Sequence, residues 1–150
     1  MKKSKVIEIF RFLNSIKLNK VSNKEMRSAI ISNHMQMHNI AKQYDEDVKE
    51  LQKKLFEGKE ESIESLNSLR EEYKKANDSR KKEIETTIIK DHSDILSLEI
   101  EFNNEIVNLL NSEVELNLKK VTQDIFIDSC VEADVDITSG DLIILTDLFE

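Results

Sequence analysis

The chain has 150 residues and a net charge of −8, with 39% apolar and 35% charged residues. It is too apolar for a disordered chain and too charged for a thick globular core. We therefore expect one domain, residues 1–150, with a narrow core such as the seam between paired helices. No segment approaches the ~18 consecutive apolar residues of a membrane span, and no membrane partner is expected.

Charge is distributed in blocks along the chain. Residues 1–41 carry a net charge of +6, residues 42–92 carry −2 and residues 93–150 carry −12. Opposite blocks attract over about a Debye length, ~8 Å at physiological salt. The pattern predicts that the basic first helix docks on the acidic C-terminal region of the same chain. The alternatives are a basic partner for the acidic end, or contact between the opposite ends of two copies.

The first predicted helix covers residues 4–18, where Ile9, Leu13 and Ile16 form an apolar stripe. The start of the chain is basic, but Glu8 and Arg11 interrupt the apolar residues that follow. An export signal needs a continuous apolar stretch, so export is not expected.

A second helix is predicted over residues 23–57, beginning at a capping box formed by Ser22 and Glu25. Gly58 supplies the left-handed residue that ends such a helix. The apolar positions of this helix recur at spacings of four and three, as in a coiled coil, with Asn33 as the one strongly polar member. The seam comprises Met26, Ile30, Asn33, Met37, Ile40, Tyr44, Val48, Leu51 and Leu55.

One return helix is predicted from about residue 59 to residue 112. Residues 91–94 are either a break in this helix, with Ser93 as a new cap, or one polar turn within it. The apolar positions keep the same helical spacing on both sides, which favours a nearly continuous helix. The seam of this helix contains Arg70, Asn77 and Arg80, which suit either a solvated stalk or contacts with a partner.

The predicted fold class is therefore mainly α, a long antiparallel helical hairpin with a coiled-coil-like stalk and a helical base. The stalk covers residues 23–94, and the base combines residues 1–22 with residues 95–150. In the stalk, residues 23–57 are expected to pair antiparallel with roughly residues 60–95.

The pattern changes after Glu113. Residues 114–118 alternate like a short strand, which a second strand at 135–137 could pair as a minor two-stranded β element. Residues 121–137 fit a helix capped by Thr122 and reaching about Glu132, although part of them also alternates like a strand. Thr138 is expected to cap a last helix, which reaches Phe149.

Few residues suggest chemistry. His34 and His38 lie one helical turn apart, the spacing of two metal ligands, but two ligands do not hold zinc, and histidines at the edge of the seam are the expected outcome. Residues 134–145 do not match a calcium loop, because Ser139 and Leu145 occupy its glycine and acidic positions. Cys130 is expected to be a small buried apolar residue. No catalytic group or cofactor is expected, so the chain is predicted not to be an enzyme.

The candidate interaction residues are charged. They are Asp124, Asp128, Asp134, Asp136, Arg70 and Arg80. Nucleic-acid binding through the basic N-terminal helix is an alternative that we do not expect, because the other end of the chain carries −12. Its residues would be Lys2, Lys3, Lys5, Arg11, Lys17 and Lys20.

Three segments resemble small helical proteins of tailed bacteriophages, a family of unassigned function: Phe12 to Lys20, Phe102 to Glu113 and Asp141 to Glu150. The resemblance implies a phage or prophage origin and a place in the host cytoplasm or the virion, and it brings no activity or functional residues. The leading hypothesis is a non-enzymatic protein–protein interaction module with a structural or assembly role, docking another phage protein or a second copy. The alternative is an acidic inhibitor of a host nucleic-acid-binding protein.

Overall fold

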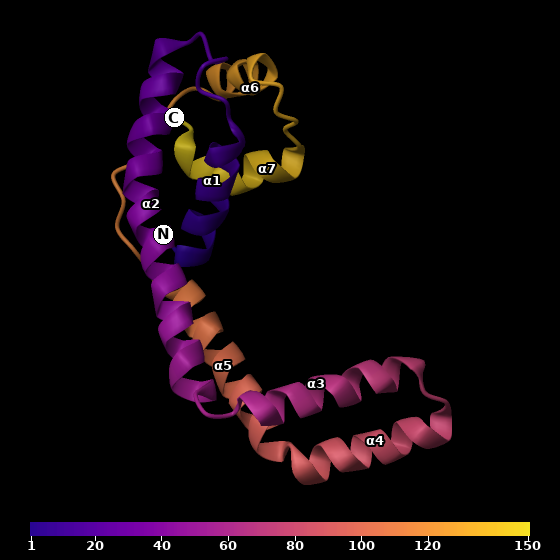
Figure 1. Ribbon diagram of the computed structural model, residues 1–150. Coiled ribbons are helices and arrows are strands. Elements are labelled where there is room, and N and C mark those ends of the chain that lie inside the picture. The colour runs from indigo at the N-terminus through magenta and orange to yellow at the C-terminus, as the bar shows by residue number, and fades with distance from the viewer. The chain divides into compact units, whose positions relative to one another are not determined.

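The computed structural model describes all 150 residues, and the predicted mainly helical fold is confirmed (Figure 1). The helices are α1 (Lys3–Ser15), α2 (Lys24–Phe56), α3 (Glu60–Lys75), α4 (Asp78–Asp91), α5 (Ser93–Asn111), α6 (Gln123–Glu132), α7 (Ser139–Ile144) and the 3-10 turn η1 (Leu145–Leu148).

Contacts divide the chain into two compact units. The terminal unit combines Met1–Asp45 with Leu109–Glu150, and the middle unit is Glu46–Asn108. Helices α2 and α5 each run from one unit into the other. The boundaries between the two units therefore lie after residues 45 and 108. The stalk predicted from the sequence covers a different range, residues 23–94.

The core of the terminal unit is built by α1, α2, α6 and η1. The predicted stripe of α1 is buried, and it meets buried residues of α2 such as Met26 and Ile30. Phe126 of α6 is 1% exposed, and its ring lies 6.0 Å from that of Phe12 and 5.3 Å from that of Phe149. These aromatic contacts join α1, α6 and the end of the chain.

The opposite charge blocks meet within the terminal unit. Lys5 pairs with Asp147, and Lys20 pairs with Asp134. The side chain of Glu132 accepts hydrogen bonds from the backbone N–H and the hydroxyl of Ser22, at 2.8 and 2.7 Å. The basic N-terminal region therefore contacts the acidic C-terminal region of the same chain. The predicted capping role of Ser22 is wrong, because Asn23 accepts the hydrogen bond from the N–H of Met26 instead, at 2.9 Å.

The predicted β element is wrong: the chain has no strand and only isolated bridges. The alternating residues after Glu113 instead form an extended segment that two side chains of α2 bind. Asn33 accepts from the N–H of Lys119 and donates to its C=O, both at 2.8 Å. Gln36 makes the same two bonds with Asn117, at 3.1 and 2.9 Å. Side-chain amides thus satisfy backbone groups that a neighbouring strand would otherwise pair.

The helices of the C-terminal region agree with their predicted caps. Thr122 accepts from the N–H of Ile125 at the start of α6, and Thr138 and Asp141 form a capping box at the start of α7. Helix α6 ends at Glu132, as predicted, while the last predicted helix divides into α7 and η1.

Within the middle unit the chain changes direction at more places than the sequence predicts. Gly58 has a φ of 77° and ends α2, as expected. The return helix, however, is not continuous. Asn77 caps α4, accepting from the N–H of Arg80, so α3 and α4 form an antiparallel hairpin of their own (Figure 1).

A second break falls at His92, which separates α4 from α5. The His92 side chain is 8% exposed, with Nε2 3.3 Å from the Ser65 hydroxyl oxygen and Nδ1 buried without a hydrogen-bond partner. Beyond this break α5 lies beside the last turns of α2, where the rings of Phe56 and Phe102 are 5.8 Å apart (Figure 1). The predicted pairing of residues 60–95 with α2 is therefore wrong, because α5 occupies that position.

Replacing Gly58 by alanine is expected to destabilise the protein by about 1 kcal/mol, because a Cβ is strained at positive φ even though nothing lies near it. Gly140→Ala is the matched control. It lies in the first turn of α7 without positive φ, and its Cβ would make an ordinary 3.5 Å contact with Thr138. Urea unfolding should show a lower free energy of unfolding for Gly58→Ala only. Equal unfolding midpoints for wild type and Gly58→Ala would contradict the role of Gly58.

Candidate interaction site

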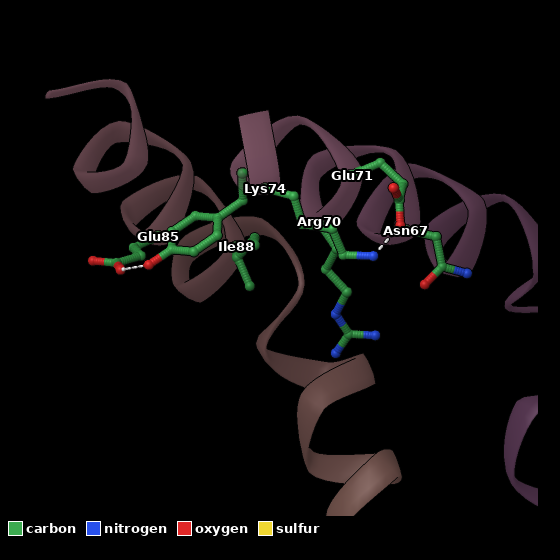
Figure 2. Close-up of a pocket in the computed structure, with 7 residues that line it drawn as sticks. Asn67, Arg70, Glu71, Lys74, Glu85 and Ile88 are labelled. Carbon is green, nitrogen blue, oxygen red and sulfur yellow. Dashed lines mark hydrogen bonds and ion pairs between the residues drawn. The ribbon is translucent and has the colours of Figure 1, made fainter. Parts of the chain in front are cut away.

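A pocket with mostly polar lining residues, which we call the polar pocket, lies in the α3–α4 hairpin of the middle unit and has a volume of about 590 Å³ (Figure 2). It is lined by Asn67, Arg70, Glu71, Tyr73, Lys74, Glu85 and Ile88. Lys74 pairs with Glu71 at 2.5 Å, and the Tyr73 hydroxyl donates to Glu85 at 2.8 Å. That hydrogen bond raises the pKa of Tyr73, which keeps the phenol protonated. Lys74 and Glu71, like Tyr73 and Glu85, are thus paired with one another within the hairpin.

Arg70, predicted as an interaction residue, is bound within the chain. Its guanidinium donates two hydrogen bonds to the carboxylate of Glu99 on α5, at 2.8 and 2.6 Å. This bidentate geometry lowers the pKa of Glu99 and raises that of Arg70. Arg70 thus ties α3 to α5 inside the middle unit.

Replacing Glu99 by glutamine should remove a pH-dependent part of the stability. The folded pKa of Glu99 is depressed, so its contribution is present above the unfolded value of ~4.3 and is lost as the pH falls through the folded value. Because both side chains are more than a third exposed, the loss at pH 7 should stay below about 1 kcal/mol.

Thermal unfolding from pH 7 to pH 3 measures this effect. The curves of wild type and Glu99→Gln should converge at acid pH, while the exposed neighbour Glu101→Gln should follow wild type throughout. A constant difference between wild type and Glu99→Gln at every pH would show that the ion pair is not its cause.

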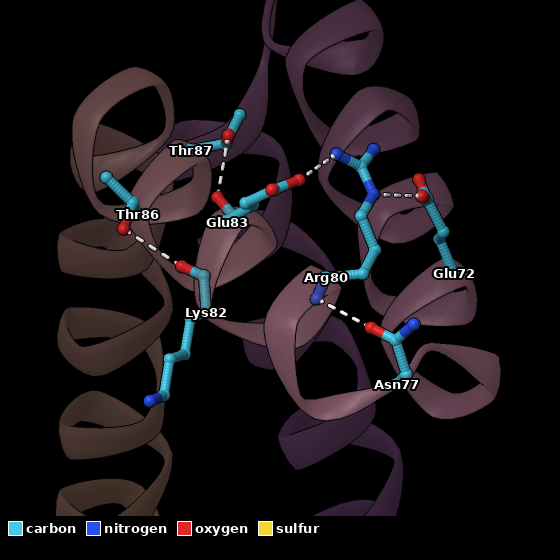
Figure 3. A network of polar contacts seen from close by, with 7 residues as sticks. All are labelled: Glu72, Asn77, Arg80, Lys82, Glu83, Thr86 and Thr87. Atoms are coloured by element: carbon cyan, nitrogen blue, oxygen red, sulfur yellow. Dashed lines mark hydrogen bonds and ion pairs between the residues drawn. The ribbon is translucent and has the colours of Figure 1, made fainter.

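Arg80 is likewise engaged, in a polar network at the turn between α3 and α4 (Figure 3). Its guanidinium donates to Glu72 at 2.7 Å and to Glu83 at 2.9 Å, and both bonds raise its pKa. Its backbone N–H donates to the capping Asn77. Arg70 and Arg80, which were predicted to lie in the seam of the return helix, therefore both form ion pairs within the chain.

His34 and His38 stack on one another, with ring centroids 6.2 Å apart, and Phe10 packs against both. His34 Nε2 lies 2.6 Å from the Asn14 side-chain oxygen. No three His, Cys, Asp or Glu side chains converge as metal ligands would. The pair thus belongs to an aromatic contact between α1 and α2.

Cys130 is fully buried in the core of the terminal unit. Burial, with a smaller contribution from Asp141, raises the pKa of its thiol to about 11. A thiol that stays protonated inside a core does not act as a nucleophile.

The four candidate aspartates do not form one site. Asp134 pairs with Lys20, which lowers its pKa. Asp124, Asp128 and Asp136 are exposed and make no hydrogen bond or ion pair with the chain. Asp124 and Asp128 are one turn apart on α6 and share its outer face with Val131, which is 68% exposed.

An apolar groove lies between the end of α1 and the first half of α2, with a volume of about 310 Å³. We call it the α1–α2 groove. Its outer wall carries Ile31, 48% exposed, and Met35, 66% exposed, whose flexible thioether adapts to different partners. Its lining is Leu13, Asn14, Ile16, Leu18, Ile30, Ile31, His34 and Met35.

Helix α5 also leaves large apolar side chains uncovered. Nine of its residues are large and apolar, yet only Ile95 is fully buried, while Ile100 is 62% and Val107 54% exposed. The sequence interpretation missed both exposed surfaces because it assigned one apolar stripe to each helix. The missed signal was a second stripe on the same helix.

No protein-family model, curated protein or solved structure matches this chain. Its helices include none that combines the length and the apolar character needed to span a membrane.

Proposed function

We propose that the chain is a non-enzymatic helical protein–protein interaction module with a structural or assembly role, encoded by a phage or prophage and acting in the host cytoplasm or the virion. One observation carries the proposal: charged groups of the polar pocket are paired within the chain, whereas large apolar side chains face water at the α1–α2 groove and on α5. These exposed side chains are Ile31, Met35, Ile100 and Val107. Ordered apolar faces of this kind are typical of protein docking surfaces.

The α1–α2 groove provides the test for a protein partner. A tagged chain expressed in the phage-infected host should retain a partner that Ile31→Asp with Met35→Asp releases. Ile143→Asp is the matched control, since Ile143 is 73% exposed and lies on α7, outside the groove. If wild type and both variants retained the partner equally, the α1–α2 groove would not be its binding site. A chain that retains no protein and remains monomeric would reject the proposed function.

An acidic inhibitor of a host nucleic-acid-binding protein is the second candidate, because Asp124, Asp128 and Asp136 remain unpaired on the surface. Such binding should weaken steeply with salt and with the pair Asp124→Asn and Asp128→Asn. Asp134→Asn is the internal comparison, because Asp134 already pairs with Lys20. If wild type and the variants bound with the same affinity at every salt concentration, this candidate function would be rejected.

The remaining alternative is a nucleic-acid-binding surface on the N-terminal helix, and it is less well supported. Two of its basic side chains, Lys5 and Lys20, are paired with aspartates of the same chain. Neutralised side chains contribute little to the release of counterions that drives such binding.

A further inference from the structure

Helix α5 carries two apolar stripes on adjacent faces. The inner stripe contains Phe102, which meets Phe56 of α2. The second stripe, which we call the outer stripe, recurs at spacings of four, three, four and three residues. It comprises Leu96, Ile100, Asn103, Val107 and Leu110. Leu96 and Leu110 are half-buried, and the three central members are exposed. Nothing in the chain covers the centre of this stripe.

The residue types of the outer stripe match one type of coiled coil. In heptad positions, the β-branched Ile100 and Val107 occupy position a, while Leu96 and Leu110 occupy position d. β-branched residues at a with leucine at d favour two parallel strands. Asn103 occupies the central d position. A buried asparagine needs a polar partner, and in a parallel pair of identical helices that partner is the same asparagine of the other copy.

We propose that the outer stripe of α5 is a self-association surface, which pairs in parallel with the outer stripe of a second copy about a twofold axis along the helices. This inference rests on the proposed role in protein interaction, and it specifies one partner, a second copy of the chain, and one surface. Asn103 of one copy faces Asn103 of the other and fixes the register.

The outer stripe is a surface on which two copies of this acidic chain can meet without direct repulsion between charged side chains. Two copies each carry a net charge of −8, so their acidic surfaces repel, but the outer stripe has no charged member. The e positions beside it hold Ser97, Asn104 and Asn111, which are uncharged. In parallel pairing the g-position Glu99 therefore faces Asn104 of the other copy and not a second carboxylate, and it is already paired with Arg70.

The length of the stripe sets the expected strength. Five positions make a short interface, in the class below ~1,200 Å² of total buried area that gives weak, reversible contacts. The inner stripe already holds α5 against α2, so the association does not have to order a helix first. We therefore expect a monomer–dimer equilibrium that depends on protein concentration.

Sedimentation equilibrium of the full chain tests the surface. Wild type should dimerise reversibly, and Ile100→Asp with Val107→Asp should weaken dimerisation on the order of 100-fold, because each aspartate would be buried without a partner. Val131→Asp with Ile143→Asp is the matched control, since both residues are at least as exposed as Ile100 and Val107 but lie on α6 and α7. A strictly monomeric wild type, or a dimer that survives in the α5 variant, would overturn the proposal.

Disulfide formation tests the parallel register. Asn103→Cys should oxidise to a covalent dimer, whereas Asn108→Cys, exposed on the same helix at a b position, should not. Cys130 does not interfere because it is fully buried. A wild-type dimer in which Asn103→Cys fails to cross-link would overturn the parallel arrangement.

The two proposals fail separately. If the α5 variant becomes monomeric but still retains a host partner through Ile31 and Met35, the proposed function does not depend on dimerisation. If wild type is strictly monomeric and still retains that partner, the inference fails and the proposed function stands. If wild type dimerises through α5 but retains no other protein, the second copy is its partner.

Discussion

Phe126→Ala is expected to destabilise the terminal unit by about 3–5 kcal/mol, the usual cost of removing a fully buried phenylalanine. Phe126 is 1% exposed, and its ring contacts Phe12 at 6.0 Å and Phe149 at 5.3 Å between centroids. Alanine would leave a cavity that the neighbouring helices cannot close without moving, because Phe126 joins α1 to the end of the chain. A loss of this size is a large fraction of the stability of a domain.

The measurement is urea unfolding followed by circular dichroism, together with hydrogen exchange of α6 amides, since the two units need not unfold together. Phe126→Leu fills most of the same volume and should cost less than about 1.5 kcal/mol. Phe102→Ala is the comparison in the middle unit, where the ring is only half-buried. If Phe126→Ala left the exchange of α6 unchanged, the central place of Phe126 in the core would be wrong.

The sequence predicted those parts of the fold that depend on local signals. Gly58 ended the long helix because only a residue free of a Cβ takes positive φ cheaply, and Thr122 and Thr138 capped their helices through hydroxyls that reach the next turn. The burial of Cys130 was also predictable from its residue type.

The breaks in the return helix were missed although a local signal existed. Asn77, Asp78 and Ser79 are residues that favour helix starts, but the spacing of the predicted seam continued across them, through polar residues such as Arg80, and gave the impression of one helix. Phase cannot distinguish a continuous helix from two helices joined by a short turn. The consequence was large, because a reversal at Asn77 pairs α3 with α4 and leaves α2 to α5.

The candidate site residues were predicted least well. Arg70 and Arg80 were chosen for their polarity in a seam, yet their partners, Glu99 and Glu72, depend on how the helices reverse. The alternation that predicted a strand after Glu113 was real, since Val114, Leu116 and Leu118 pack against the core. What the sequence could not reveal is that the backbone partners of this segment are side chains of a helix.

Replacing Asn33 by alanine is expected to cost about 2–3 kcal/mol. Its side chain is 2% exposed and is the partner of both the N–H and the C=O of Lys119, so its loss leaves two backbone groups without partners in a partly buried position. Gln36→Ala removes the equivalent pair at Asn117, which is exposed to water, and should cost less than about 1 kcal/mol. Hydrogen exchange should show faster exchange of the Lys119 amide in the first variant.

Asn33→Asp separates the hydrogen bonds from simple packing, because the two side chains have nearly the same shape. A carboxylate at this position still accepts from the N–H of Lys119 but faces its C=O with a second acceptor, and burial penalises its charge. Both effects raise the pKa of the introduced carboxyl in the folded state, so stability should be lowest at neutral pH and recover as acidification protonates the group and restores a donor. Relative to wild type, Asn33→Ala has no such group and should show no recovery. If both variants lost stability equally at pH 7 and at pH 4, packing and not the paired amide would hold the extended segment on α2.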